Sequence, residues 1–304
     1  MMSYDLDEAS VRRLVANALN DRPETGSRFL ALAVGAATPL SEVARTVERQ
    51  VFEETFGMDA ATMSAEYARY EDDSMFFLVL DRKTGLPAGA ARVIDGGGKT
   101  LDDAPAHIGY DLDTITAVHH MRAGRIWDFA TLAVLPAYRG GRNGLSVSAL
   151  LYRTFLNAGR LAGVHHVVAM LDSRAHRNLK LIGVEFAPMC GADPFEYLGS
   201  PATEALYVAF ADLTPQIARQ ADRLRKLGVD RSAPGDTGPN SAGPNSAGPN
   251  SAGPSSAGQT GTGLRGLVTR RIAARVADQV SSGNGLDEHI MLPALDRRRL
   301  IRQS

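Results

Sequence analysis

The chain of 304 residues has very little cysteine and no excess of charge of either sign. Its single cysteine, Cys190, excludes a disulfide within the chain and a cysteine-rich metal site. The formal net charge of -1 argues against general binding of nucleic acid, which needs a broad basic face. Long hydrophobic runs are missing too, because the most apolar early stretch, residues 29–40, is too short to span a bilayer.

A signal peptide is not visible either. The N-terminus reads Met-Met-Ser-Tyr-Asp-Leu-Asp-Glu and lacks the basic and then apolar order of a secretory leader. The content of 44% hydrophobic and 22% charged residues is that of an ordinary soluble globular protein. We therefore expect a cytoplasmic protein of one or two domains, without a transmembrane segment.

Changes in composition divide the chain into three parts. Residues 230–263 contain the unit Gly-Pro-Asn-Ser-Ala, which begins at Gly238 and repeats, and which breaks helix and strand each time. This predicts a disordered linker after a folded domain at residues 1–229. Residues 264–304 carry apolar side chains at helical spacing with arginines between them, which predicts a short basic helical tail. The tail either docks an acidic carrier protein or an anionic membrane, or folds back onto the domain.

Hydrophobic periodicity within residues 1–229 predicts helices and strands in alternation. Helices are expected at residues 5–19, 39–56, 145–163, 173–182 and 214–228, and strands at residues 28–34, 74–80, 88–94, 125–134, 165–171 and 204–213. Residues 95–99 are expected to form a loop. A hairpin followed by a strand–helix–strand crossover predicts an α/β (α+β) fold with a mixed, mostly antiparallel sheet flanked by helices.

The segment from residue 125 to residue 163 organises this fold. A strand of aromatic and branched residues ends at Pro136, a turn with three glycines follows, and a long helix comes next. Glycines let the backbone turn tightly and aim several N–H groups into one concavity at the positive end of the helix. The segment therefore predicts an anion site, and the alternative is a glycine-rich turn between strand and helix that binds no ligand. Its candidate ligands are Arg139, Gly140, Gly141, Arg142, Asn143 and Gly144.

Residues 132–144 resemble the acyl-CoA-binding motif of the GNAT N-acyltransferases, whose usual form is Arg or Gln, two spacers, Gly, one spacer, then Gly or Ala. Arg139 and Gly144 match its first and last positions, whereas Arg142 replaces the first glycine. The resemblance implies a GNAT fold and acyl-CoA or acyl carrier protein as co-substrate, with no permanently bound cofactor. It also implies that a strand splayed from its neighbour offers a backbone N–H to the reaction's oxyanion. The candidate donors are Leu132, Ala133 and Val134.

Asp128 is the candidate general base. Strand alternation places it on one face with Ile126, Ala130 and Leu132, so a carboxylate interrupts an apolar row. Burial there would raise its pKa toward a value suited to proton transfer at neutral pH. The alternative is a carboxylate near the rim of the sheet that pairs with a neighbouring arginine.

The acid that protonates the leaving sulfur is less well marked. Many GNAT enzymes carry a tyrosine three or four residues before a Gly-Phe pair, and the matching place here is Leu179-Lys180, ahead of Gly183. Tyr197 is the candidate donor in place of that tyrosine. The alternatives are that Tyr197 is a core aromatic residue, and that the sulfur leaves as thiolate or is protonated by water.

Residues 48–57, 66–71 and 89–92 together resemble the N-terminal half of the autoinducer synthases and the related long-chain N-acyl amino acid synthases. The resemblance implies that Glu66 and Arg92 help to hold an amino-acid substrate, although a strand arginine also suits a structural ion pair. Autoinducer synthases carry Glu, a spacer, Ser, Arg and Phe on the strand that holds Asp128 here. Thr131 stands where that arginine is expected, which favours a broader N-acyltransferase.

These observations predict an enzyme that moves an acyl group from acyl-CoA or acyl carrier protein to the amine of a small molecule such as an amino acid. The alternatives are an autoinducer-type signal synthase and a non-catalytic acyl-CoA-binding module. No metal site is expected, because the adjacent histidines His165 and His166 point to opposite faces of a strand and no HExxH spacing occurs.

Overall fold

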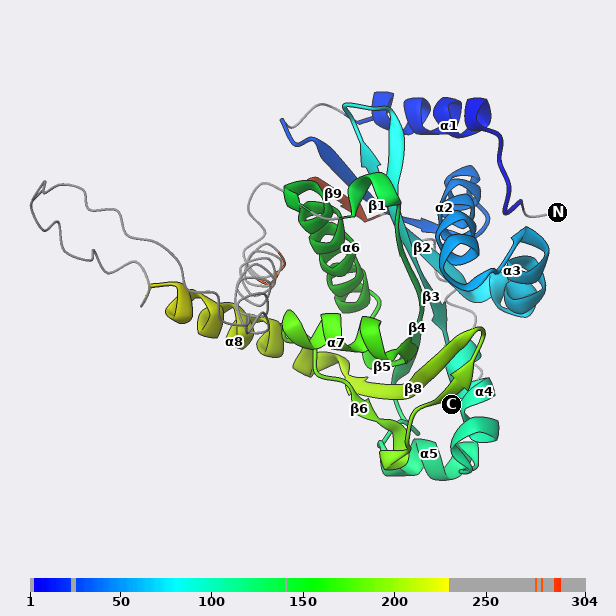
Figure 1. The fold of residues 1–304 in the computed structure, drawn as a ribbon, viewed down its shortest axis with the longest axis vertical. Coiled ribbons are helices and arrows are strands. Elements are labelled where there is room, and N and C mark those ends of the chain that lie inside the picture. Colours follow the sequence, from blue (N-terminus) through cyan, green and yellow to red (C-terminus); the bar gives the residue numbers. More distant parts are fainter. Residues whose placement is uncertain are drawn as a thin grey trace, which may run out of the picture.

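The computed structural model describes residues 3–22, 26–139, 141–229, 277, 280 and 287–290, and within them it forms a nine-stranded sheet (Figure 1). The strands are β1 (Phe29–Gly35), β2 (Ser74–Asp81), β3 (Leu86–Asp95), β4 (Arg125–Val134), β5 (Val164–Asp172), β6 (Ala187–Pro188), β7 (Phe195–Tyr197), β8 (Ser200–Ala209) and β9 (Asp287–Ile290). Their order is β6-β8-β5-β4-β3-β2-β1-β9, and β7 pairs with β8. Only the pairs β4–β5 and β1–β9 are parallel among these strands, which confirms the predicted mixed, mostly antiparallel sheet.

Helices cover both faces of the sheet (Figure 1). They are α1 (Glu8–Asn20), α2 (Pro39–Phe56), α3 (Ala60–Tyr67), α4 (Gly98–Ile108), α5 (Leu112–Val118), α6 (Gly141–Leu161), α7 (Ser173–Leu181) and α8 (Phe210–Val229). Alternate residues of β1 face opposite helices, since Leu30 packs in one core with Val47 of α2 and Ala31 packs in another with Leu150 of α6. None of the described helices has the length and apolar character that a bilayer crossing requires.

Several element boundaries differ from the prediction, and two of these differences have a clear local cause. Residues 95–99 do not form only a loop, because α4 begins at Gly98, and the positive φ angles of 89° at Gly97 and 46° at Gly98 let the chain turn directly into it. The last predicted strand ends at Ala209 instead of residue 213, and α8 begins at once. There the ring of Phe210 lies so close to Gly159 of α6 that a Cβ at Gly159 would be 2.5 Å from it.

Strand β4 contains a bulge that changes which side chains share a face. The register with β3 shifts between Arg92, which pairs with Thr131, and Val93, which pairs with Phe129, so Ala130 has no partner in the pairing. The predicted alternation is therefore wrong beyond the bulge. Thr131 lies on the face of Asp128, whereas Leu132 packs against the core on the α6 side.

Beyond this bulge, β4 and β5 separate. They pair only from Arg125 to Asp128 on β4, and the last partner on β5 is Val168. From there β4 continues to Val134 beside β3, while β5 continues to Asp172 beside β8. The two central strands of the sheet thus form a V that opens toward the start of α6 and α7.

Most of the predicted linker and tail lies outside the described residues, and the division at residues 230–263 and 264–304 stays a prediction. Within the tail, Ala277 and Val280 are buried in the core on the α6 side. Strand β9 adds to the sheet edge beside β1, with Leu30 opposite Asp287. These described parts of the tail fold back onto the domain, and β9 is a strand within a segment predicted to be helical.

Candidate active site

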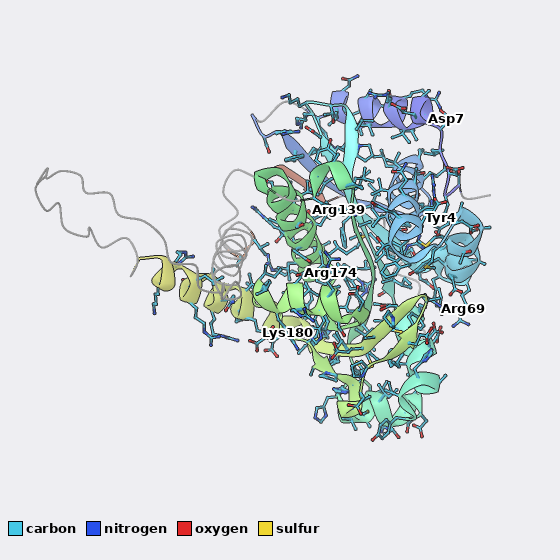
Figure 2. The ribbon with its side chains drawn as sticks, viewed as in Figure 1. Tyr4, Asp7, Arg69, Arg139, Arg174 and Lys180 are labelled. Atoms are coloured by element: carbon cyan, nitrogen blue, oxygen red, sulfur yellow. The ribbon has the colours of Figure 1, made fainter. Side chains whose placement is uncertain are left out.

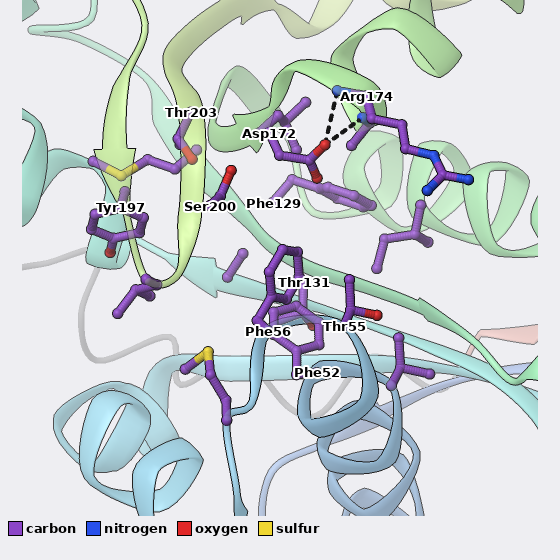
Figure 3. A pocket seen from close by; sticks show the side chains of 18 of the residues that line it. Phe52, Thr55, Phe56, Phe129, Thr131, Asp172, Arg174, Tyr197, Ser200 and Thr203 are labelled. Carbon is purple, nitrogen blue, oxygen red and sulfur yellow. Dashed lines mark hydrogen bonds between the residues drawn. The ribbon is translucent and has the colours of Figure 1, made fainter.

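A cavity of about 400 Å³ lies where β4 and β5 separate (Figure 3). Strand β4 forms its floor from Asp128 to Val134, and α2 contributes Phe52 and Phe56. The starts of α4 and α7, the end of β5, the β7–β8 hairpin and Tyr152 of α6 also line it. In Figure 3, Tyr197 lies on one side of the cavity and Arg174 on the opposite side. The cavity is therefore an elongated space with an end near Asp128 and Tyr197 and an end near the starts of two helices.

Asp128 is fully buried and lines the cavity. The backbone N–H of Thr100 donates to its Oδ2 at 2.9 Å, and the Thr100 hydroxyl donates to its Oδ1 at 2.7 Å. No described lysine or arginine pairs with it, so the alternative of an arginine-paired carboxylate at the rim is wrong. Burial raises the pKa of Asp128 to about 7, although the two bonds from Thr100 oppose this shift. A carboxylate with that pKa is suited to accept a proton at neutral pH.

Thr100 comes from the first turn of α4, which the sequence analysis missed. Its N–H belongs to the amides that a helix leaves without an internal partner, so a carboxylate is stabilised there. Gly98 permits the close approach, because a Cβ at this position would lie 2.9 Å from Asp128 Oδ2. The sequence Gly-Gly-Gly-Lys-Thr that precedes and includes Thr100 could have indicated this helix start. A glycine-rich polar stretch of this kind is also typical of a surface loop, which is what the sequence predicted.

Two backbone amides of β4 point into the V. The N–H of Leu135 donates to the Ala88 carbonyl on β3 at 3.1 Å, so by strand alternation Ala133 also points to β3, and Leu132 and Val134 point away. Arg139 agrees with this assignment, since its Nε donates to the Val134 carbonyl at 2.8 Å from the open side. Among the three predicted oxyanion donors, the geometry therefore favours Leu132 and Val134 over Ala133.

The predicted anion cradle lies at the other end of the cavity. Gly140 is outside the described residues, and Gly141, Arg142, Asn143 and Gly144 form the first turn of α6, so the turn is shorter than predicted. The side chain of Arg139 lines the cavity and is 41% exposed, and its Nη2 lies 3.0 Å from Glu54 Oε2.

A second helix start faces the same end of the cavity. Asp172 caps α7 by accepting the N–H groups of Arg174 at 2.8 Å and Ala175 at 3.0 Å. Arg174 also lines the cavity, and Figure 2 shows Arg139 and Arg174 on the same side of the sheet as α6 and α7. Arg139 and Arg174 thus bring two guanidinium groups to this end of the cavity, where the Asp172 carboxylate occupies the α7 N-terminus and Glu54 pairs with Arg139.

Tyr197 lies beside Asp128 at the opposite end. It belongs to β7, lines the cavity, and donates its hydroxyl to Asp103 at 2.6 Å. Burial and the Asp103 carboxylate both raise the pKa of Tyr197. The ammonium of Lys99, which lines the cavity, lies 2.7 Å from Asp103 and 2.6 Å from Glu66, and Glu66 is not among the described residues that line the cavity.

Arg92 is not among the described residues that line the cavity. Its guanidinium is fully buried, with Nη2 at 2.8 Å from Glu48 and Nη1 at 3.2 Å from Glu71. Glu48 also accepts the hydroxyl of Thr131. This arrangement is the structural ion pair stated above as the alternative to substrate binding.

Tyr152 of α6 is a cavity residue that the sequence analysis did not single out. It lines the cavity together with Phe129 and Leu179, which occupies the place predicted for the missing tyrosine. Helical spacing gives no sign that this side chain faces a cavity, because the opening depends on the separation of β4 and β5. Within the described residues no group of three His, Cys, Asp or Glu is arranged to hold a metal ion.

Comparisons with known proteins give similarity in structure alone. No family model matches the sequence, and no curated protein matches it. FeeM, an N-acyl amino acid synthase from uncultured soil microbes, aligns over 62% of this chain and 95% of its own, at 14% identity and a TM-score of 0.47. The AHL synthase LasI aligns over 61% of this chain and 91% of its own, at 13% identity and a TM-score of 0.44. These likenesses concern the fold, and we infer the function from the cavity itself.

Proposed function

We propose that this protein is an N-acyltransferase that moves an acyl group from a thioester carrier to the amine of a small molecule. The observation that carries the proposal is the buried carboxylate of Asp128, with a pKa of about 7, inside a cavity that follows an opened strand. Strand geometry places Asp128 and Val134 roughly 20 Å apart along β4. The cavity is thus long enough for an extended carrier arm whose phosphates and thioester lie at different ends.

Each demand of the reaction has a candidate at a suitable place. The carrier's phosphates bind Arg139, Arg174 and the N–H groups at the start of α6, which lie at the end opposite Tyr197. The N–H of Leu132, which is the nearer of the two donors to Asp128, stabilises the negative oxygen that forms when the amine attacks the thioester carbonyl. Asp128 accepts the proton of the attacking amine, directly or through water. Acyl-CoA and acyl carrier protein both present the phosphate and thioester that this arrangement requires.

The two alternative functions make different demands. An autoinducer-type synthase would form a lactone after acyl transfer, and Thr131 in place of the expected arginine argues against it, because its hydroxyl is bonded to Glu48. A non-catalytic module has no use for an unpaired buried carboxylate, which costs stability when it ionises. The raised pKa of Asp128 therefore favours the enzyme over the module.

Release of free CoA from acyl-CoA of several chain lengths, measured with a panel of amines and with mass spectrometry of the product, tests the proposal. We expect an acylated amine, and we expect Asp128→Asn to lower turnover at least about 100-fold while CoA affinity stays unchanged. Asp113→Asn is the matched control, because Asp113 forms an exposed ion pair with Arg122 on α5. If the unmutated protein binds acyl-CoA but transfers an acyl group neither from CoA nor from acyl carrier protein, that result would favour the module.

A further inference from the structure

The end of the cavity near Asp128 has more negative than positive charge around it. Among the described residues, Lys99 is the only cation that lines this end, and its ammonium lies 2.6 Å from Glu66 and 2.7 Å from Asp103. One positive charge thus faces two negative ones, and Asp128 adds a further negative charge when it ionises. The ammonium is neutralised by its two partners, so it attracts the carboxylate of a bound molecule only weakly.

The other positive groups near this end also have partners. Arg92 is fully buried in its ion pairs with two glutamates and is not among the described residues that line the cavity. Arg69 has a side chain that is 65% exposed, and it pairs with Asp102. The first turn of α4 gives the N–H of Thr100 to Asp128 at 2.9 Å. Within the described part of the chain, no cation at this end is therefore without a carboxylate partner.

The carboxyl group of Asp128 shows how this environment acts on an anion. Burial is the main cause of its raised pKa, and of its two charged neighbours Asp103 raises the pKa more than Lys99 lowers it. Tyr197 agrees with this, because burial raises its pKa first and the charges of Asp103 and Asp128 raise it further. An added carboxylate is thus disfavoured at this end, whereas an ammonium group is attracted to it.

The walls around Asp128 are apolar or aromatic. One hydrophobic cluster includes Ile94, which pairs with Asp128 across β3 and β4. The side chains of this cluster that also line the cavity are Phe52, Phe56, Met58, Tyr67, Ala130 and Leu198. Leu198 is held in this wall although its φ of 45° is a conformation that leucine rarely adopts. A molecule that brings its nitrogen to Asp128 therefore places its neighbouring atoms against hydrocarbon and rings.

We propose that the acceptor is a primary amine that carries an apolar group and no carboxylate. The inference rests on the proposed acyl transfer. The surplus of negative charge attracts the acceptor as an ammonium ion, the apolar walls hold its hydrocarbon part, and Asp128 takes up the proton of the attacking nitrogen. An amino acid would instead place its carboxylate among these negative charges. Glu66 and Arg92, which the resemblance implies as its ligands, are both engaged in ion pairs.

Three amines with the same ring and the same reacting nitrogen test the inference, namely phenethylamine, phenylalanine and phenylalanine amide. We compare kcat/KM at saturating acyl-CoA, corrected for the fraction of unprotonated amine. Phenethylamine should exceed phenylalanine by about 100-fold or more, because like charges repel in a cavity shielded from water. The amide fills the space of the carboxylate without its charge, so it should stay within about tenfold of phenethylamine. Ethanolamine, which lacks an apolar group, should react more slowly than phenethylamine.

Glu66→Gln tests whether charge is the cause. The Glu66 carboxylate pairs with Lys99 and is not among the described groups that line the cavity, so the variant removes one negative charge and leaves the walls in place. The ratio of kcat/KM for phenylalanine to that for phenethylamine should rise several-fold. Glu53→Gln is the matched control, because Glu53 is 48% exposed where it pairs with Arg49. Circular dichroism and thermal melting establish that both variants fold.

Four results would overturn the inference. Phenylalanine could react as well as phenethylamine, or phenylalanine and its amide could lose equally, which would indicate a limit of size instead of charge. Ethanolamine could react faster than phenethylamine, or Glu66→Gln could leave the ratio of the two amines unchanged. All four leave the proposed acyl transfer standing. A failure of the unmutated protein to acylate any amine from any thioester would instead defeat the proposed function itself, so the two failures are distinguishable.

Discussion

Glu48 and Asp128 are two fully buried carboxylates on the same face of the sheet, and they differ in their hydrogen-bond partners. Glu48 accepts hydrogen bonds from the guanidinium of Arg92 and from the hydroxyl of Thr131. Among the described residues, Asp128 accepts hydrogen bonds only from Thr100, a neutral residue. The first carboxylate is neutralised and joins α2 to the sheet, whereas the second forms no ion pair with a described residue and can take up a proton near pH 7.

The comparison shows that burial alone does not mark a reactive carboxylate. The bulge at Ala130 brings Thr131 onto the face of Asp128, only three positions along the strand. Glu48, which accepts the Thr131 hydroxyl, belongs to an ion-pair network and is not among the described residues that line the cavity, whereas Asp128 lines it. A cation partner is the feature that separates the structural residue from the functional one.

The largest effect is expected from Arg92→Met, which keeps the volume and removes the charge. Glu48 would then be a buried carboxylate without its cation, so the free energy of unfolding should fall by about 3–5 kcal/mol. Urea denaturation measures this. Arg122→Met is the control, because Arg122 and Asp113 have side chains that are 60% and 85% exposed. Equal stability of the two variants would mean that the network does not hold α2 to the sheet.

Asp128→Asn should have the opposite effect on stability. Folding raises the pKa of Asp128 from the ordinary value of 3.8 to about 7, so the folded state binds the extra proton and stability falls as the pH rises through this range. Asparagine has no proton to lose. The variant should therefore be more stable than the unmutated protein at about pH 8, by up to about 4 kcal/mol, and this gain should shrink toward about pH 4. A gain that does not depend on pH would contradict the raised pKa.

Arg139 should behave as the reverse of Arg92. Its side chain is 41% exposed and lines the end of the cavity where we propose that phosphate binds, so Arg139→Ala should leave the melting temperature nearly unchanged. Loss of one charge-assisted bond to the carrier should raise KM for acyl-CoA about tenfold, with little change in kcat. Arg12→Ala, at an exposed pair on α1, is the control for kinetics. An unchanged KM would remove Arg139 from the carrier site.

The smallest effect is expected from Thr100→Val. The Thr100 hydroxyl lowers the pKa of Asp128, so its removal should move the midpoint of the pH–rate profile upward, by less than about one unit. Thr131→Val is the matched control, because Thr131 bonds to Glu48 and should not move the midpoint. A shift of similar size in both variants would show that the two carboxylates are not independent.

Local patterns in the sequence predicted the central elements well. Strand β4 has the predicted bounds, and α2 begins with Pro39 and ends before Gly57 as expected, because proline and glycine set helix ends locally. The prediction of Asp128 as a buried carboxylate with a raised pKa also agrees with the structure. Strand periodicity and one charged residue in an apolar row were enough for it.

The rest depended on contacts between distant segments. The bulge at Ala130 follows from pairing with β3, and no property of residue 130 reveals it. Thr100 reaches Asp128 because Gly98 allows a helix to begin where a loop was predicted. The cavity exposes Tyr152 only because β4 and β5 stop pairing after Asp128. Such features arise from tertiary packing, which local periodicity does not encode.

The pH dependence of acyl transfer tests the central claim most directly, because it reports the proton on Asp128 in the working protein. We predict that kcat/KM for the amine, measured at saturating acyl-CoA and corrected for the fraction of unprotonated amine, rises with pH and levels off with a midpoint near the Asp128 pKa of about 7. Asp128→Asn should abolish this step along with most of the rate. A midpoint that stays in place in Asp128→Asn, at a rate close to that of the unmutated protein, would contradict the account.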